Sequence, residues 1–136
     1  MILLLQTNVD HTTALWLIQN KNILVKKEET VEFPQRTTPL IQLDSALRQL
    51  KKTPRDIRRI IVSRGPGRFS AVRSGLLISN TLSKELRIPI QGVVRKTLCS
   101  DQEAVQLAQK YKSSTSMTPI KPWYGKKPNI TKPKQR

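Results

Sequence analysis

The sequence predicts an α/β protein, and three observations carry this prediction. Three strand-like segments open the chain, two helix-like segments with regularly spaced apolar residues follow, and short aliphatic strands stand between and after those helices. Strands and helices that alternate in this way pack as a sheet with helices against its faces. A length of 136 residues fits one compact domain.

The first three strands are predicted at residues 1–6, 12–18 and 23–31. The first is a continuous aliphatic run, which is typical of a strand buried on both faces. Residues 19–22 are Gln-Asn-Lys-Asn, and they predict a turn because Asn tolerates a positive φ. The three strands therefore suggest an antiparallel meander.

The first long helix is predicted from about residue 38 to residue 51. Apolar side chains recur there at spacings of three and four, which places them on one helical stripe: Leu40, Leu43, Leu47 and Leu50. Ordinary core packing is the favoured interpretation of the stripe, and its heptad-like spacing also suits a helix–helix interface. Thr53 and Pro54 then predict a short helical turn through Ile57, with Thr as the cap.

A second long helix, residues 69–86, follows a buried strand at 60–62 and a sharp connection at 64–68. Glycine and proline in Arg-Gly-Pro-Gly-Arg demand an unusual backbone there. The helix is apolar on two sides, one of which carries Phe69, Val72 and Leu76. Two apolar sides predict two neighbours, the sheet of this chain and either a second helix or a partner protein.

The remaining chain is predicted as a strand, a helix and a tail. Residues 88–94 form the strand, with proline near its start, and 97–112 have helical character. Residues 113–136 are basic and carry four prolines, which exclude a continuous helix. We therefore expect two parts, an α/β domain at 1–112 and a basic, Pro-rich tail at 113–136.

The net charge of +16 points to a polyanion partner, with nucleic acid ahead of a membrane surface. The alternative is that the excess only keeps the protein soluble. The candidate nucleic-acid contacts are Arg64, Arg68, Lys121, Lys126, Lys127, Lys132 and Lys134. A tight structural turn is the favoured interpretation of residues 64–68, since the Gly-Lys-Ser/Thr ending of a P-loop is missing. Trp123 and Tyr124 suit base stacking and burial against the domain equally well.

The sequence offers no catalytic residues, no metal site and no cofactor. One cysteine, Cys99, and one histidine, His11, exclude an internal disulfide and a Cys/His zinc cluster. The acidic residues are isolated and form no acid/base pair. No segment has the length of a membrane span or the form of a signal peptide, so we expect a cytoplasmic protein without membrane contact.

Four stretches of the chain can be compared with known families by their order: residues 1–7, the helix after Gln35, residues 56–62 and residues 88–93. In this order they resemble the TsaB family, the non-catalytic partner subunit in bacterial threonylcarbamoyladenosine synthesis on tRNA. Its motif Gly-Pro-Gly-Ser-Phe-Thr-Gly-hydrophobic-Arg-hydrophobic-Gly is matched by Gly65, Pro66, Gly67, Phe69, Arg73 and Gly75. Residues 122–124 and Pro128 are similar to its terminal Pro-x-Tyr-x-Arg-x-Pro stretch.

The resemblance implies an actin/Hsp70-like, ribonuclease H-like α/β domain with a mixed sheet and flanking helices. It implies a minimal form in which most of the second domain is missing. The implied partners are a TsaD-like catalytic subunit, a TsaE-like ATPase and tRNA through the complex, and the isolated chain is expected to self-associate as a homodimer. The implied interface lies on the two long helices, at Leu40, Leu43, Leu47, Leu50, Phe69, Val72, Arg73 and Leu76.

Some residues of this chain differ from those of the family and of its fold, and these differences argue against a nucleotide site. Catalytic relatives with this fold carry Asp at the end of strand one, where this chain has Gln6. The motif is altered at Arg68, Ser70 and Ala71. The first hypothesis is a non-catalytic adaptor subunit for a TsaD-like enzyme that modifies the adenosine next to the anticodon. The second is a stand-alone basic nucleic-acid-binding protein on a degenerate actin-like fold, and an ATP-dependent enzyme is disfavoured.

Overall fold

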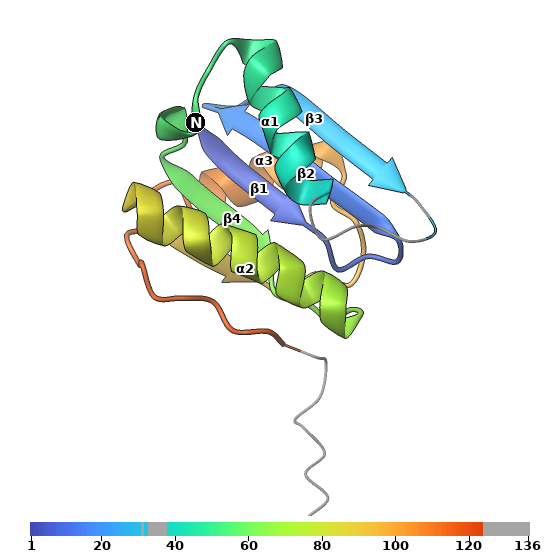
Figure 1. The fold of residues 1–136 in the computed structure, drawn as a ribbon. Coiled ribbons are helices and arrows are strands. Elements are labelled where there is room, and N and C mark those ends of the chain that lie inside the picture. Colours follow the sequence, from blue (N-terminus) through green and yellow to red (C-terminus); the bar gives the residue numbers. More distant parts are fainter. Residues whose placement is uncertain (31, 33–37, 124–136) are drawn as a thin grey trace, which may run out of the picture.

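The computed structural model describes residues 1–30, 32 and 38–123 of the chain (Figure 1). Its sheet has five strands in the order β3-β2-β1-β4-β5. They are β1 (Ile2–Gln6), β2 (Thr12–Gln19), β3 (Asn22–Thr30), β4 (Arg59–Ser63) and β5 (Ile90–Val93). The helices are α1 (Thr38–Leu50), the short 3-10 helix η1 (Pro54–Asp56), α2 (Phe69–Leu86) and α3 (Asp101–Lys110).

The sheet is mixed, and β1 is its central strand. β1 pairs antiparallel with β2 and β2 antiparallel with β3, which confirms the predicted meander. β1 pairs parallel with β4, and β4 parallel with β5. Because β1 is flanked on both edges and covered on both faces, Leu3, Leu4 and Leu5 are all 1% exposed. The aliphatic run that opens the sequence thus has the buried position that its composition predicts.

Two hydrophobic cores lie on opposite faces of the sheet. α1 and α2 lie side by side on one face, where Leu43, Leu47, Val72 and Leu76 pack with Leu3 of β1 (Figure 1). α3 covers the other face, where Ala104 and Ala108 pack with Leu4 and Trp16. Successive residues of β1 supply the two cores alternately, as the period of a strand requires.

The predicted helices and strands are confirmed. Some of their boundaries differ from the prediction, and at α3 the capping residues explain the difference. α3 begins at Asp101, later than the predicted residue 97, because the Ser100 hydroxyl accepts from the Glu103 N–H and the Glu103 carboxylate accepts from the Ser100 N–H. Such a capping box fixes the first turn of a helix. The predicted cap at Thr53 is also present, with Pro54 as the first residue of η1.

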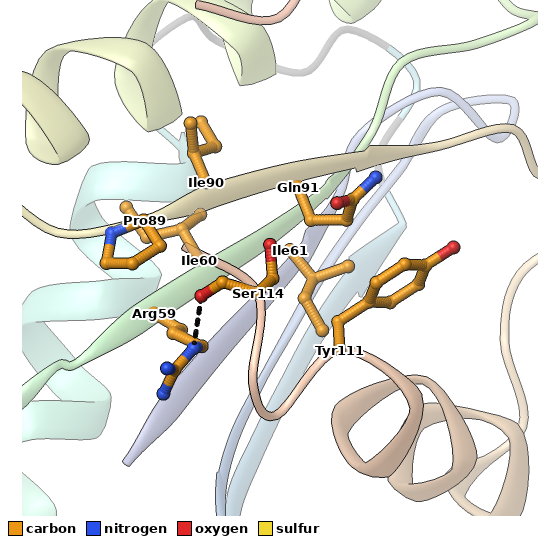
Figure 2. A pocket seen from close by; sticks show the side chains of 8 residues that line it. All are labelled: Arg59, Ile60, Ile61, Pro89, Ile90, Gln91, Tyr111 and Ser114. Atoms are coloured by element: carbon orange, nitrogen blue, oxygen red, sulfur yellow. Dashed lines mark hydrogen bonds between the residues drawn. The ribbon is translucent and has the colours of Figure 1, made fainter. Parts of the chain in front are cut away.

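Residues 114–123, here called the C-terminal strap, lie along β5 and α2. The Ser116 carbonyl accepts from the Ile90 N–H at 2.8 Å, and the Ser114 carbonyl accepts from Arg59 Nε at 2.9 Å. Figure 2 shows the Arg59–Ser114 contact, with Gln91 and Tyr111 beside it. Ile120 packs against the α1/α2 core. The division between domain and tail at residues 112 and 113 stays a prediction.

None of the helices in the described part of the chain is both long and apolar enough to cross a membrane.

Candidate functional site

The carboxyl end of β1 carries three consecutive buried polar residues, and Gln6 is the first of them. Gln6 is 1% exposed. Its Nε2 donates to the Thr97 carbonyl at 2.7 Å, and its Oε1 accepts from the Cys99 N–H at 2.9 Å. One side-chain amide therefore holds the loop before α3 against the central strand. An ionised Asp at this position has no hydrogen to donate, so Gln6 is suited to this contact in a way that a carboxylate is not.

Asn8 connects the same end of β1 to two loops. Its Nδ2 donates to the carbonyls of Pro66, at 2.7 Å, and of Arg95. A Cβ on Gly67 would lie 2.3 Å from the Asn8 carbonyl oxygen, so only glycine fits this approach. The Gly-Pro-Gly turn thus closes directly over the end of the central strand.

The other two motif glycines also serve close packing. Gly65 has a φ of +124°, and a Cβ there would meet the Trp123 carbonyl oxygen at 1.9 Å. In α2, a Cβ on Gly75 would meet Thr7 Oγ1 at 2.3 Å, and that hydroxyl donates to the Ala71 carbonyl at 2.8 Å. The favoured interpretation of this motif as a tight structural turn agrees with these contacts.

Two acidic groups near this end of the sheet, the Cys99 thiol and the Glu103 carboxyl, have shifted pKa values. Burial raises the pKa of the Cys99 thiol, which keeps it protonated and poorly nucleophilic. The pKa of Glu103 is lowered, first by the Ser100 backbone N–H and then by Arg95, so its carboxylate is held as a structural anion. Among the described residues no group of three His, Cys, Asp or Glu side chains could hold a metal ion.

An exposed apolar surface lies on α1 and α2, on the side away from the sheet. Leu40 is 46% exposed, Ile41 64%, Phe69 58% and Leu77 68%. The Arg73 guanidinium lies over the Phe69 ring, 4.8 Å from its centroid. These five residues are here called the outer helix surface. A shallow hollow of about 410 Å³ follows α2 along Phe69, Arg73 and Leu77.

The outer helix surface corrects part of the predicted partner interface. Leu43 and Leu47 are 5% and 4% exposed, and Val72 and Leu76 are 0% and 3% exposed. These four side chains fill the core beneath the helices and are not accessible to a partner, so their assignment to an interface is wrong. Leu50 also packs partly against that core.

Of the predicted set, Leu40, Phe69 and Arg73 are exposed, and the exposed apolar side chains of Ile41 and Leu77 were not part of that set. The signal in the sequence was the spacing of Phe69, Arg73 and Leu77, which are four residues apart and share one helical stripe. The predicted stripe instead groups Phe69 with Val72 and Leu76, which are buried in the core.

Of the predicted nucleic-acid contacts, the structure describes Arg64, Arg68 and Lys121. Arg64 and Lys121 lie together, because Arg64 Nε donates to the Lys121 carbonyl at 3.0 Å. The Trp123 N–H donates to the Arg64 carbonyl at 2.7 Å. Arg68 is exposed, with Nη1 3.3 Å from His11 Nδ1. The remaining predicted contacts, Lys126, Lys127, Lys132 and Lys134, and also Tyr124, lie outside the described residues.

Comparison with solved structures defines the class of fold. The chain is similar to YeaZ from Pseudomonas aeruginosa, with a TM-score of 0.61 and 20% identity, over 68% of this chain and 44% of that one. It is also similar to an uncharacterized protein with similarity to peptidase YEAZ from Pseudomonas aeruginosa, with a TM-score of 0.64 and 18% identity, over 83% of this chain and 48% of that one. With its mixed five-stranded sheet and flanking helices, the chain has an actin/Hsp70-like fold.

Comparison of sequences then gives the family. Residues 32–109, more than half of the chain, match the family model TsaD, described as tRNA N6-adenosine threonylcarbamoyltransferase. Two curated relatives are the tRNA threonylcarbamoyladenosine biosynthesis proteins TsaB of Buchnera aphidicola, 28% identical over 68% of this chain, and of Bacillus subtilis, 26% identical over 62%. The chain therefore belongs to the family that this model describes, and the two curated relatives it is similar to are TsaB proteins. It spans 43% and 37% of the lengths of these two relatives.

Proposed function

We propose that the chain is a non-catalytic adaptor subunit for a TsaD-like catalytic partner in the threonylcarbamoylation of tRNA, at the adenosine next to the anticodon. The outer helix surface is the observation that carries this proposal. It presents three aliphatic side chains and one aromatic ring on two neighbouring helices. Large apolar side chains that are exposed on one face of a domain are typical of protein–protein contact sites.

The shape of this surface favours a helical partner. α1 and α2 lie on the same face of the sheet (Figure 1), and a hollow follows α2 along Phe69, Arg73 and Leu77. Side chains of two further helices packed against this helix pair would complete a bundle. The Arg73 guanidinium lies over the Phe69 ring, so each side chain restricts the other before a partner binds. Aromatic residues and arginine are among the residue types that most often dominate binding energy at interfaces. The same surface on two copies supports the expected homodimer of the isolated chain.

The end of β1 supports an adaptor rather than an enzyme. Gln6 and Asn8 use their amides to hold the chain's own loops. A phosphate or a metal ion at this position would have to displace those contacts. The proposal therefore assigns ATP and metal chemistry to the TsaD-like partner, with a TsaE-like ATPase as a further member and tRNA bound through the complex.

Size-exclusion chromatography with a cognate TsaD-like subunit tests the adaptor role. We expect co-elution of the wild-type chain and loss of the complex in Leu77→Glu and Phe69→Glu, because each places a charge in the apolar contact. Gln106→Glu is the matched control, since it adds the same charge at an exposed position of α3 on the opposite face of the sheet. A complex that survives both outer variants would overturn the assignment.

A stand-alone nucleic-acid-binding protein is the second candidate, favoured by one observation. The strap brings Lys121 beside Arg64, and four of the predicted contacts follow at positions 126–134 of the sequence. Lysine contacts to phosphate release counterions, so log affinity falls with log salt by about 0.7 per contact on a single strand. Removing the charges of Lys126, Lys127, Lys132 and Lys134 would reduce that slope if the tail binds RNA. An unchanged slope would reject the RNA role, and RNA binding without any TsaD-like partner would favour this second candidate.

A further inference from the structure

A cavity of about 400 Å³ opens at the end of the sheet opposite to the Gly65–Gly67 turn. It lies where β1 and β4 begin, where β2 ends and where α3 finishes, and its apolar lining consists of Met1, Ile2 and Ile18. It is therefore separate from the end of β1 that carries Gln6, and separate from the outer helix surface.

Four basic side chains line this cavity and come from three different segments. Lys21 is in the β2–β3 turn, Arg58 and Arg59 precede and begin β4, and Lys112 follows α3. None of the four forms an ion pair with an acidic side chain of the described residues, although the ion pairs found elsewhere engage Lys26, Arg48 and Arg95. The nearest acid in sequence, Asp56, is turned to the Thr53 N–H at 2.8 Å.

Backbone contacts hold the walls in place. Gln109 Nε2 donates to the Asn20 carbonyl at 2.9 Å, which joins α3 to the β2–β3 turn. Arg59 Nε donates to the Ser114 carbonyl, which orients that guanidinium and leaves its Nη groups without a hydrogen bond to the described residues. The turn that carries Lys21 and the strand start that carries Arg59 are therefore each fixed by a hydrogen bond to another segment.

Neighbouring cations act on the Met1 α-amine, whose residue also lines the cavity. Burial is the first cause of its lowered pKa, the charges of Arg58 and Lys52 lower the pKa further, and the charge of Asp56 opposes them. Neighbouring positive charges repel one another, and a bound polyanion reduces this repulsion. A single carboxylate would neutralise one of four cations, whereas a chain of phosphate groups spans several of them.

We propose that this cavity is a binding site for a chain of phosphate groups, supplied by an RNA backbone or by an inorganic polyphosphate. Arg58 and Arg59 offer planar forks that match phosphate oxygens. Lys21 and Lys112 supply two further point charges. The apolar lining offers no hydrogen bond to phosphate oxygens, so these oxygens would lie against the basic side chains. The site does not depend on the adaptor role, because it uses none of the residues of the outer helix surface.

The test compares two triple variants of equal net charge. The first is Lys21→Gln/Arg58→Gln/Lys112→Gln, which spares Arg59 and its contact with Ser114. The control is Lys51→Gln/Lys84→Gln/Arg87→Gln, which removes three exposed charges that line no described cavity. Tripolyphosphate and a short single-stranded RNA of mixed sequence are titrated against each, with affinity measured by calorimetry and by fluorescence anisotropy.

We expect the cavity variant to bind about tenfold more weakly than the control variant, as the loss of three surface charge pairs implies. Amide NMR shifts of the wild-type chain should concentrate at Asn20, Lys21, Arg58 and Arg59 on addition of tripolyphosphate, a readout that needs no variant. Binding of RNA alone, or of tripolyphosphate alone, identifies the source of the phosphates and supports the site. Equal weakening in both variants, shifts centred elsewhere, or no binding of either probe to the wild-type chain would overturn the proposal.

Discussion

The side-chain amide of Asn80 forms two hydrogen bonds with the backbone of Ile120. Nδ2 donates to the Ile120 carbonyl at 3.0 Å, and Oδ1 accepts from the Ile120 N–H at 2.8 Å. A side chain of α2 thus pairs with the strap as a neighbouring strand would, and it does so where Ile120 joins the core. The strap is therefore an integral part of the packed α/β unit at this point.

Asn80→Asp should weaken this attachment. The carboxylate loses the donor to the Ile120 carbonyl, and the lost or unsatisfied hydrogen bond costs about 1–3 kcal/mol. We expect faster hydrogen exchange at the Ile120 amide, with the amides of β1 unaffected. Thr81→Asp, an exposed change on the same helix, is the control. Unaltered exchange at Ile120 in the Asn80 variant would contradict a strap held by this residue.

Gln6→Glu should destabilise the fold without creating catalysis. The Cys99 N–H keeps an acceptor, but the second carboxylate oxygen then faces the Thr97 carbonyl oxygen. Two acceptors without a hydrogen between them repel each other in a buried site. The expected loss in the free energy of unfolding is at least about 2 kcal/mol at neutral pH. Lower pH should reduce the loss, because a protonated carboxyl again donates. Urea unfolding at two pH values measures both effects, with Gln106→Glu as the exposed control. Full stability at neutral pH would show that the Thr97 contact is dispensable.

Gly75→Ala and Thr7→Ala should be coupled. The added methyl at Gly75 would lie 2.3 Å from Thr7 Oγ1, and overpacking of this kind costs about 1–3 kcal/mol. Removal of the Thr7 side chain beyond Cβ opens that space, so the double variant should lose less stability than the two single losses added together. Coupling of more than about 0.5 kcal/mol in a double-mutant cycle is expected for residues in contact. Simple additivity would mean that helix α2 shifts to accommodate the methyl group.

Leu43→Ala and Leu77→Ala separate the core of the two helices from their outer surface. Leu43 is 5% exposed, so its truncation should cost about 2–5 kcal/mol. Leu77 is 68% exposed, so its truncation should change stability by no more than about 0.5 kcal/mol. Thermal unfolding of the isolated chain at low concentration measures both. A large loss at Leu77 that grows with protein concentration would instead report self-association through the outer helix surface.

Glu103 should make the fold sensitive to acid. Its pKa is lowered from the ordinary value of 4.5, first by the Ser100 N–H and then by Arg95. A lowered folded-state pKa contributes stability above the unfolded value, and that contribution is lost as the pH falls through the folded value. Glu103→Gln keeps an acceptor for the cap and removes the charge. We expect its deficit in melting temperature to be present at neutral pH and to shrink below about pH 4.5. Glu85→Gln removes an exposed carboxylate and is the control; a deficit independent of pH would assign the effect to packing.

The sequence alone determined the strands, the helices and much of the packing. The aliphatic run at residues 1–6 is the central strand, the 3.6-residue period located α1 and α2, and the Gly-Pro-Gly turn gave the family. These features are local, because periodicity and turn chemistry act between residues that are close along the chain.

Only the tertiary structure decided which side of each helix is outward, and what the buried amides do. Leu43 and Leu77 are equally apolar in sequence, and the position of the sheet buries one and exposes the other. Gln6 could be seen as a departure from a catalytic Asp, but its partners Thr97 and Cys99 lie more than ninety residues away along the chain. The four cations of the cavity that we propose as a phosphate site likewise come from three separate segments. Contacts between segments distant in sequence form only when the whole sheet assembles, so no local pattern encodes them.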